Sequence, residues 1–255
     1  MKILVFQHVA SEHPGSFREV MAARGCEMQA VELDEGEAIP ADLAGFDALL
    51  VMGGPQDVWE TDQFPWLIEE KAVIRDWVRA GRPYLGMCLG HQLLAEALGG
   101  AVGRMAVPEV GMSCVETRPD PIFTGLPPLW PCMQWHGAEV TRLPEGAVAL
   151  AGSPGCAIQA QRYGRAAYGL QFHLELTHST TAEWGSLPEY KAALERVRGP
   201  GGLAAMVAEV DAQFPELHAA AQIVFGNFLD IAEQAFLNGD EQASRDSAAR
   251  ALAGR

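Results

Sequence analysis

Over the first hundred residues of the chain, short apolar runs alternate with segments whose apolar positions recur at helical spacing. The runs are typical of buried strands, which we expect at residues 2–6, 28–33, 48–52 and directly before Cys88. Helices are expected at residues 17–24, 65–80 and directly after Cys88. Alternating strands and helices build a parallel sheet whose sites form beyond the carboxyl ends of strands. The pattern therefore predicts an open, mostly parallel α/β sheet with helices on both faces.

After residue 100 the pattern changes to short strands separated by turns. We expect an extra mixed or antiparallel strand region, with strands at residues 110–117, 130–135, 147–151, 157–162 and 167–172. The C-terminus is helical, with apolar spacing over residues 203–210, a longer helix from about 216 to 237, and a loop at residues 199–202. We divide the chain into a main domain, residues 1–198, and a helical extension, residues 199–255. Residues 240–255 are polar, and we expect a mobile tail or an oligomer contact.

The net charge of the chain disfavours two classes of binding partner. Among 255 residues, 33 acidic against 18 basic side chains give a formal net charge of −15, which repels phosphate backbones and anionic lipid. Neither nucleic acid nor a membrane is an expected partner, and the subunit count stays open. No apolar run approaches the ~18 residues of a membrane span, and no cleavage signal follows the N-terminus, so we expect a cytoplasmic protein. Five widely spaced cysteines predict no disulfide and no metal site, and no cofactor is expected.

Cys88 lies between an expected buried strand and an expected helix. Gly86 and Gly90 flank it at two residues on either side, where a sharp turn needs backbone without Cβ atoms so that strand and helix approach closely. This arrangement is typical of a nucleophile elbow, with cysteine in place of serine. The first helical N–H groups and the helix dipole favour thiolate, and a nearby histidine would complete the activation.

Two motifs carry a resemblance to a known family. The run from Gly86 to Gln92, Gly-Met-Cys-Leu-Gly-His-Gln, resembles the Gly-x-Cys-x-Gly-x-Gln signature of class I glutamine amidotransferases. The run from Gln171 to Glu175, Gln-Phe-His-Leu-Glu, resembles their second signature. The chain is most similar to stand-alone proteins that resemble the amidotransferase domain of GMP synthase. The resemblance implies a flavodoxin-like sheet and hydrolysis of the side-chain amide of glutamine to glutamate and ammonia.

The catalytic roles follow from the residues and the resemblance together. Cys88 is the expected nucleophile, His173 the base and acid, and Glu175 the group that orients the imidazole. The spacing of His173 and Glu175 suits a strand end, where alternate side chains point the same way. The expected oxyanion hole consists of the backbone N–H groups of Leu89 and Gly54.

The expected substrate-binding residues are Gly53, Gln92 and His136, with Gln92 taken from the family signature. One position departs from the family. Related proteins carry an aspartate that holds the α-amino group of glutamine, and Ala138 stands in its place. Glu139 is adjacent, but a slip of one residue normally points a strand side chain elsewhere.

Three functions stay open for this reason. The first is a glutaminase that supplies ammonia to a synthetase subunit on another polypeptide. The second is a γ-glutamyl peptidase with the same triad, acting on small γ-glutamyl compounds. The third is a non-catalytic binding or regulatory protein that keeps the fold, supported only by Ala138.

Overall fold

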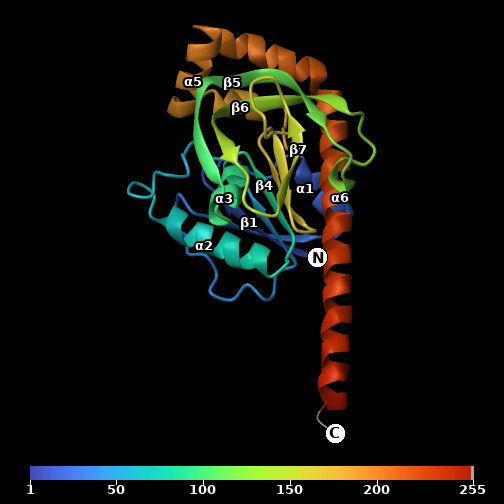
Figure 1. The fold of residues 1–255 in the computed structure, drawn as a ribbon. Coiled ribbons are helices and arrows are strands. Elements are labelled where there is room, and N and C mark those ends of the chain that lie inside the picture. Colours follow the sequence, from blue (N-terminus) through green and yellow to red (C-terminus); the bar gives the residue numbers. More distant parts are fainter. Residues whose placement is uncertain (254–255) are drawn as a thin grey trace.

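A computed structural model describes the backbone of residues 1–253 and the side chains of residues 1–237. Its centre is one nine-stranded sheet in the order β2-β1-β3-β4-β9-β8-β7-β5-β6 (Figure 1). The five strands from β2 to β9 run parallel, and the remaining pairings are antiparallel. The parallel strands are β1 (Lys2–Gln7), β2 (Glu27–Glu32), β3 (Ala48–Val51), β4 (Tyr84–Met87) and β9 (Ala167–Leu170). This confirms the predicted α/β sheet with an additional antiparallel region.

Helices cover both faces of the parallel half. Helices α1 (Phe17–Ala23) and α6 (Gly202–Ala253) lie on one face, and α2 (Trp66–Arg79) and α3 (Leu89–Ala97) lie on the other (Figure 1). Side chains of β1 divide between the two cores with period two, because successive residues of a strand point to opposite faces. Ile3 and Val5 join the core of α1 and α6, whereas Leu4 and Phe6 join that of α2 and α3.

The antiparallel half is built on longer strands than the sequence predicts. Strand β5 spans Ala101–Thr117 and β6 spans Leu129–Arg142, joined through the short 3-10 helix Pro121–Phe123. The parts of these strands that were not predicted contain Pro108 and Gly137, residues that are more typical of turns. The pairing absorbs them through a register shift near Pro108. Strands β7 (Ala147–Gly152) and β8 (Ala160–Tyr163) connect β5 to β9.

The C-terminal region is helical, but its division differs from the prediction. Helices α4 (Thr180–Trp184) and α5 (Pro188–Arg198) are followed by a single helix, α6, that includes Pro215. The expectation of a separate helix from residue 216 is wrong. A proline inside a helix removes one hydrogen bond, and here buried residues on both sides, Val210 and Leu217, hold the helix together. The expected roles of residues 240–255 lie outside the described side chains.

A third core forms where α4, α5 and the first turns of α6 pack against β6. Its buried side chains include Met133 and Trp135 of β6, Trp184 of α4 and Tyr190 of α5. This core closes one side of the site described below. Within the described part of the chain, no helix combines the length and the apolar character needed to span a bilayer.

Candidate active site

Cys88 occupies a strained turn between β4 and α3. Its φ of 46° is the only positive φ of a non-glycine residue in the described part of the chain. A Cβ on Gly86 would lie 2.4 Å from the backbone of Gly90, and a Cβ on Gly90 would lie 2.3 Å from the carbonyl oxygen of Val51. Both glycines are therefore required by close backbone approach, as the elbow interpretation predicts.

Neighbouring strands hold the elbow in place. The N–H of Cys88 donates to the carbonyl of Leu170 at 2.7 Å, and the N–H of Gly90 donates to the carbonyl of Met52 at 3.2 Å. The hydroxyl of Tyr84 donates to the carbonyl of Gly90 at 2.7 Å. Because β4 pairs with β3 and β9 on its two sides, the segments that follow all three strands meet at Cys88.

His173 and Glu175 follow β9 and form a buried hydrogen-bonded pair. The His173 Nδ1 lies 2.7 Å from Glu175 Oε1, and both side chains are 1% exposed. The second carboxylate oxygen accepts the N–H of Leu174 at 2.9 Å. The backbone of His173 bridges to Met133 of β6, with the N–H of His173 donating at 2.8 Å. The imidazole therefore has a fixed orientation.

The free nitrogen of this imidazole is Nε2, which is buried and makes no hydrogen bond to a nitrogen or oxygen atom. Burial lowers the pKa of His173, but Glu175 and Cys88 outweigh it and hold the pKa well above its usual range. Burial raises the pKa of the Cys88 thiol, and His173 acts against that rise. A thiolate at Cys88 would therefore need the His173 imidazole as the acceptor of the thiol proton.

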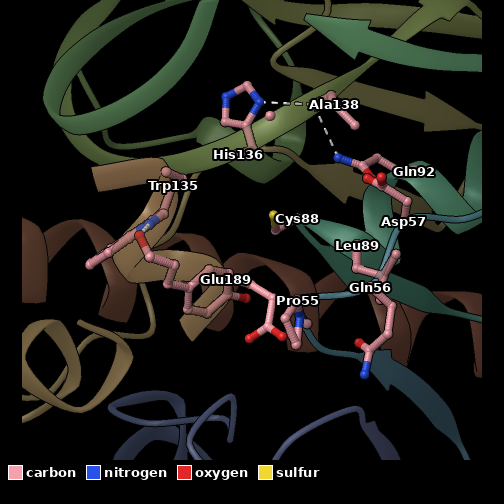
Figure 2. A pocket seen from close by; sticks show the side chains of 14 residues that line it. Pro55, Gln56, Asp57, Cys88, Leu89, Gln92, Trp135, His136, Ala138 and Glu189 are labelled. Atoms are coloured by element: carbon pink, nitrogen blue, oxygen red, sulfur yellow. Dashed lines mark hydrogen bonds between the residues drawn. The ribbon is translucent and has the colours of Figure 1, made fainter. Parts of the chain in front are cut away.

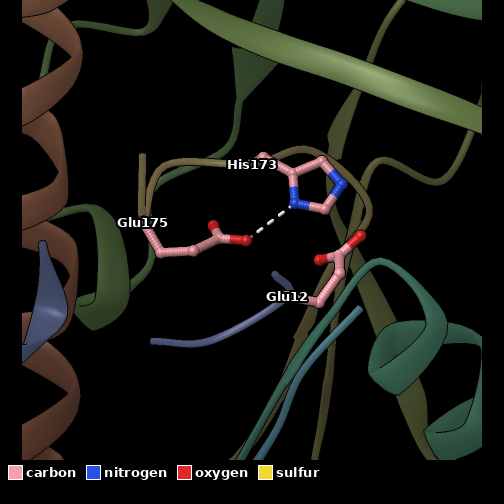
Figure 3. Close-up of side chains that lie close together, drawn as sticks. All are labelled: Glu12, His173 and Glu175. Atoms are coloured by element: carbon pink, nitrogen blue, oxygen red, sulfur yellow. Dashed lines mark hydrogen bonds and ion pairs between the residues drawn. The ribbon is translucent and has the colours of Figure 1, made fainter. Parts of the chain in front are cut away.

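Glu12, in the loop after β1, lies beside this pair and was not expected from the sequence. Its carboxyl group faces the ring of His173 (Figure 3). The Tyr190 hydroxyl donates to Glu12 Oε1, while Oε2 has no partner and packs against Gly53. Burial raises the pKa of Glu12 to about 7 against the opposing effect of His173. The only sequence signal was the position of the residue beyond the carboxyl end of a parallel strand.

Glu12, His173 and Glu175 are the group in the described residues whose spacing would suit a metal ion, with donor atoms within 4.8 Å of one another. Two of these donors already bond each other, and the Tyr190 hydroxyl occupies one Glu12 oxygen. Among the described residues, His173 Nε2 and Glu12 Oε2 have no hydrogen-bond partner. The hydrogen bond to Glu175 orients the His173 imidazole.

A pocket opens above the sulfur of Cys88 (Figure 2). Its walls come from the elbow, from the loop after β3, from β6 and from α5. The lining residues are Gly54, Pro55, Gln56, Asp57, Cys88, Leu89, Gln92, Trp135, His136, Gly137, Ala138, Glu189, Tyr190 and Ala193. Gly53 lies just behind this wall, and its carbonyl faces His8.

Two backbone donors at the pocket are free. Neither the N–H of Leu89 nor that of Gly54 donates a hydrogen bond to another group in the described part of the chain. Leu89 is the first residue of α3, so its N–H is one of those that a helix leaves unsatisfied. A Cβ on Gly54 would lie 3.1 Å from the Leu89 side chain, so the two segments are adjacent. Both N–H groups are available to an oxyanion.

Gln92 and His136 both bond to the backbone carbonyl of Ala138 in β6. Gln92 Nε2 donates to the carbonyl of Ala138 at 3.2 Å and to Gln171 Oε1 at 3.1 Å. His136 Nδ1 donates to the same Ala138 carbonyl at 2.9 Å, and its Nε2 lies 3.1 Å from Glu109 Oε2. Both ring nitrogens of His136 are therefore used within the protein. The two side chains line the pocket and also fix the backbone at Ala138.

The pocket lining has no carboxylate from β6 but has two from other elements. Ala138 lines the pocket, whereas Glu139 is not among the lining residues, as expected from strand alternation. Asp57 and Glu189 carry the carboxylates of the lining. Asp57 pairs with Arg104 at 3.3 Å, and Glu189 is exposed on the first turn of α5.

The fold and the elbow are those of a known class. A family model described as glutamine amidotransferase class-I matches residues 15–184, and the chain belongs to that family. The glutamine amidotransferase-like protein YfeJ of Salmonella typhimurium is 32% identical over 184 residues, which cover 69% of this chain and 77% of that protein. A glutamine-hydrolyzing GMP synthase of Thermotoga maritima is 39% identical over 141 residues, 54% of this chain.

The match covers 26% of that GMP synthase, so the chain spans about a quarter of its length. Among solved structures, a glutamine amidotransferase from Thermotoga maritima superposes with a TM-score of 0.80 at 26% identity. The superposition covers 89% of this chain and 97% of that structure. These likenesses confirm the fold expected from the two signatures.

Proposed function

We propose that the protein hydrolyses the side-chain amide of glutamine through a γ-glutamyl thioester on Cys88. The observation that carries the proposal is the strained, buried Cys88 at the N-terminus of α3, beside a His173 imidazole oriented by Glu175. Family membership supports the same reaction class. Buried, pre-oriented groups favour covalent catalysis because little reorganisation is needed during the reaction.

In the first half-reaction the Cys88 sulfur attacks the γ-carbonyl carbon, and the developing oxyanion accepts hydrogen bonds from the N–H groups of Gly54 and Leu89. His173 then gives its Nε2 proton to the amide nitrogen, the carbon–nitrogen bond breaks and ammonia leaves. Glu175 stabilises the imidazolium before this transfer. The product is a γ-glutamyl thioester with a neutral imidazole.

In the second half-reaction the neutral His173 takes a proton from water, whose oxygen attacks the thioester carbon. The same two N–H groups bind the second oxyanion. The carbon–sulfur bond then breaks, glutamate leaves, and the thiolate–imidazolium pair is restored. No cofactor or metal takes part in this scheme.

Thiol labelling with a glutamine-analogue electrophile tests the nucleophile, and the chain supplies internal controls. Burial raises the pKa of Cys132 well above its usual range and that of Cys156 to about 12, whereas Cys114 is exposed. We expect Cys88 to be labelled fastest although it is buried, because the substrate-like group brings the electrophile to it. Labelling of Cys114 at the same rate, measured by mass spectrometry, would contradict the assignment.

A second substrate class follows from the pocket lining. Ala138 supplies no carboxylate to it, and its carboxylates are those of Asp57 and Glu189. With a γ-glutamyl dipeptide, the first half-reaction would release an amino acid in place of ammonia, and the second would be unchanged. Comparing kcat/KM for glutamine with that for γ-glutamyl dipeptides decides between glutaminase and γ-glutamyl peptidase.

For the glutaminase, we propose that the ammonia passes to a synthetase on another polypeptide. The match to a synthetase of which this chain covers about a quarter supports this. Glutaminase activity that rises when a synthetase and its acceptor substrate are added would be the expected sign. Equal activity with and without every tested synthetase would favour the peptidase.

A further inference from the structure

A second buried histidine–carboxylate pair lies behind the loop that follows β3. His8 follows β1, Glu70 lies on α2, and His8 Nε2 is 2.9 Å from Glu70 Oε1 with both side chains 0% exposed. The ring of His8 stacks on Trp66 at a centroid distance of 5.3 Å. The reaction described above uses neither member. Desolvating a buried ionisable pair of this kind costs free energy. The other hydrogen bonds of the pair show which part of the backbone it positions.

The other nitrogen of His8, Nδ1, lies 2.9 Å from the carbonyl oxygen of Gly53. A carbonyl oxygen only accepts, so Nδ1 carries a proton and donates it. Since Nε2 faces the Glu70 carboxylate at 2.9 Å, both ring nitrogens carry protons, and Glu70 stabilises this imidazolium. Gln56 Nε2 also donates to the carbonyl of His8 at 3.0 Å, which ties the loop to β1 a second time.

The Gly53 carbonyl belongs to the same peptide unit as the Gly54 N–H. No peptide bond in the described part of the chain is cis, so the C=O and N–H of this unit point in opposite directions. With the oxygen held toward His8, the N–H points away from His8, on the side of the loop where Gly54 lines the pocket. A peptide between two glycines has no Cβ to resist rotation, so the loop by itself would not keep this orientation.

We propose that His8 and Glu70 are positioning residues that hold the Gly53–Gly54 peptide in the orientation that presents the Gly54 N–H to the oxyanion. This inference rests on the proposed function. The pair touches no reacting atom and acts through the peptide alone. Removing it should therefore slow the chemical step and leave ground-state binding almost unchanged.

The variant that tests this is the double substitution His8→Phe with Glu70→Leu. Phenylalanine keeps a ring on Trp66 but has no donor, and leucine avoids leaving a buried, unpaired carboxylate. Replacing a buried ion pair by apolar groups of similar size is often neutral for stability, so the loss of catalysis is separable from unfolding. The matched control is His218→Phe. His218 Nε2 lies 2.9 Å from Glu19 Oε2, and neither residue lines the pocket.

Three measurements are made on parent, double variant and control. The first is kcat and KM for the better of glutamine and a γ-glutamyl dipeptide. The second is the affinity of an N-acetylated γ-aldehyde analogue, whose carbonyl carbon bonds to the Cys88 sulfur while the aldehyde oxygen takes a proton or stays as an oxyanion. The third is the rate at which iodoacetamide alkylates Cys88, a substitution that forms no oxyanion.

For the double variant we expect kcat to fall by roughly 10²- to 10³-fold, as for the loss of one oxyanion donor, with KM changed less than about threefold. Aldehyde affinity should fall in parallel, while alkylation of Cys88 and the unfolding midpoint stay close to the parent. Unchanged kcat and aldehyde affinity would overturn the inference. So would equal losses in alkylation rate and kcat, because these indicate general disruption.

Failure of the proposed function would appear elsewhere. It would show in the parent protein as turnover that survives Cys88→Ala, or as no turnover of either substrate. The aldehyde affinities of parent and double variant, measured by protection of Cys88 from iodoacetamide, need no turnover and still decide whether His8 and Glu70 position the donor.

Discussion

The two ends of the pocket are built differently. At the reacting end, Cys88, His173 and Glu175 are at most 5% exposed, and each is tied by backbone hydrogen bonds to a neighbouring strand or loop. At the mouth, the wall consists of Ala138 on β6 and the exposed Glu189 on α5. The first end is held by hydrogen bonds from neighbouring elements, whereas at the second end Glu189 is exposed to solvent.

The difference follows from topology. The reacting end lies at the carboxyl ends of β3, β4 and β9, which are adjacent in the parallel half of the sheet. Its geometry therefore depends on the core of the fold. The mouth is added by the antiparallel half and by the C-terminal helices, which also contact the reacting end through the Met133–His173 and Tyr190–Glu12 hydrogen bonds. The two ends therefore come from different parts of the fold but share contacts.

The largest expected effects lie at the reacting end. Cys88→Ala and His173→Ala should each lower kcat by roughly a million-fold, because nucleophile and base act as one unit. Glu175→Gln should leave measurable activity, since an orienting group contributes less than the groups it orients. Steady-state kinetics with glutamine and a γ-glutamyl dipeptide measure the three losses.

Circular dichroism should show the parent fold in all three variants, which separates lost chemistry from lost structure. Turnover that survives in Cys88→Ala would rule out a thioester. A Glu175→Gln variant as inactive as Cys88→Ala would mean that the carboxylate does more than orient the imidazole.

The local structure around Cys88, His173 and Glu175 was also the part that the sequence predicted best, while their catalytic roles stay a prediction. A glycine frame around Cys88 and a His-x-Glu motif are local patterns, so they predict a turn and a strand end without knowledge of the rest. Glu12 and His8 were missed because their significance depends on burial and on partners such as Tyr190 and Glu70, far away along the chain. No local pattern marks such contacts.

The fold shows the same limit. Strands of the parallel half were predicted to within about two residues because buried strands read as short apolar runs. Strands β5 and β6 were predicted too short, because Pro108 and Gly137 lie in the parts that were missed and the strands are partly exposed. The continuity of α6 through Pro215 depends on packing and was likewise missed.

The next effect in size concerns the elbow backbone. Gly90→Ala would place a methyl group 2.3 Å from the carbonyl oxygen of Val51, where backbone must move, and we expect a loss of about 3 kcal/mol or more in unfolding free energy. Its matched control is Gly226→Ala in α6, where a Cβ meets nothing within 4 Å. That change should stabilise the protein by about 0.5–1 kcal/mol.

Urea unfolding measures both. Equal effects of the two substitutions would mean that the elbow is not packed as described. An expressed Gly90→Ala protein with normal kcat would contradict the claim that the turn itself sets the geometry of Cys88.

The next prediction concerns Glu12 and the pH dependence of the unfolding free energy. Its pKa of about 7, against 4.5 for an exposed carboxyl, means that the folded state binds this proton more tightly than the unfolded chain. Stability from this group is therefore present at low pH and is lost as pH rises from about 4.5 to 7, by roughly 3 kcal/mol in all. Glu12→Gln removes the loss while keeping an acceptor for Tyr190.

Glu12→Gln should accordingly be more stable than the parent at pH 8 and no more stable at pH 4.5, by urea unfolding at each pH. Glu69→Gln, at an exposed carboxyl on α2, serves as the control and should show no such crossover. A constant difference between Glu12→Gln and parent across this range would show that the carboxyl group is not held in a desolvated site.

The smallest effect is expected at the mouth and decides the substrate. Ala138→Asp would add a carboxylate to the pocket wall, on a backbone already fixed by Gln92 and His136. If the glutamine ammonium lies there, a charge-assisted contact worth roughly 1.5 to 3 kcal/mol should improve kcat/KM for glutamine by about one to two decades. The gain should appear mainly in KM, because the contact is remote from the γ-carbonyl.

Ala138→Asn is the matched control of similar size. Unchanged or lower kcat/KM for glutamine in Ala138→Asp, with a γ-glutamyl dipeptide turned over faster by the parent, would replace the glutaminase by the peptidase.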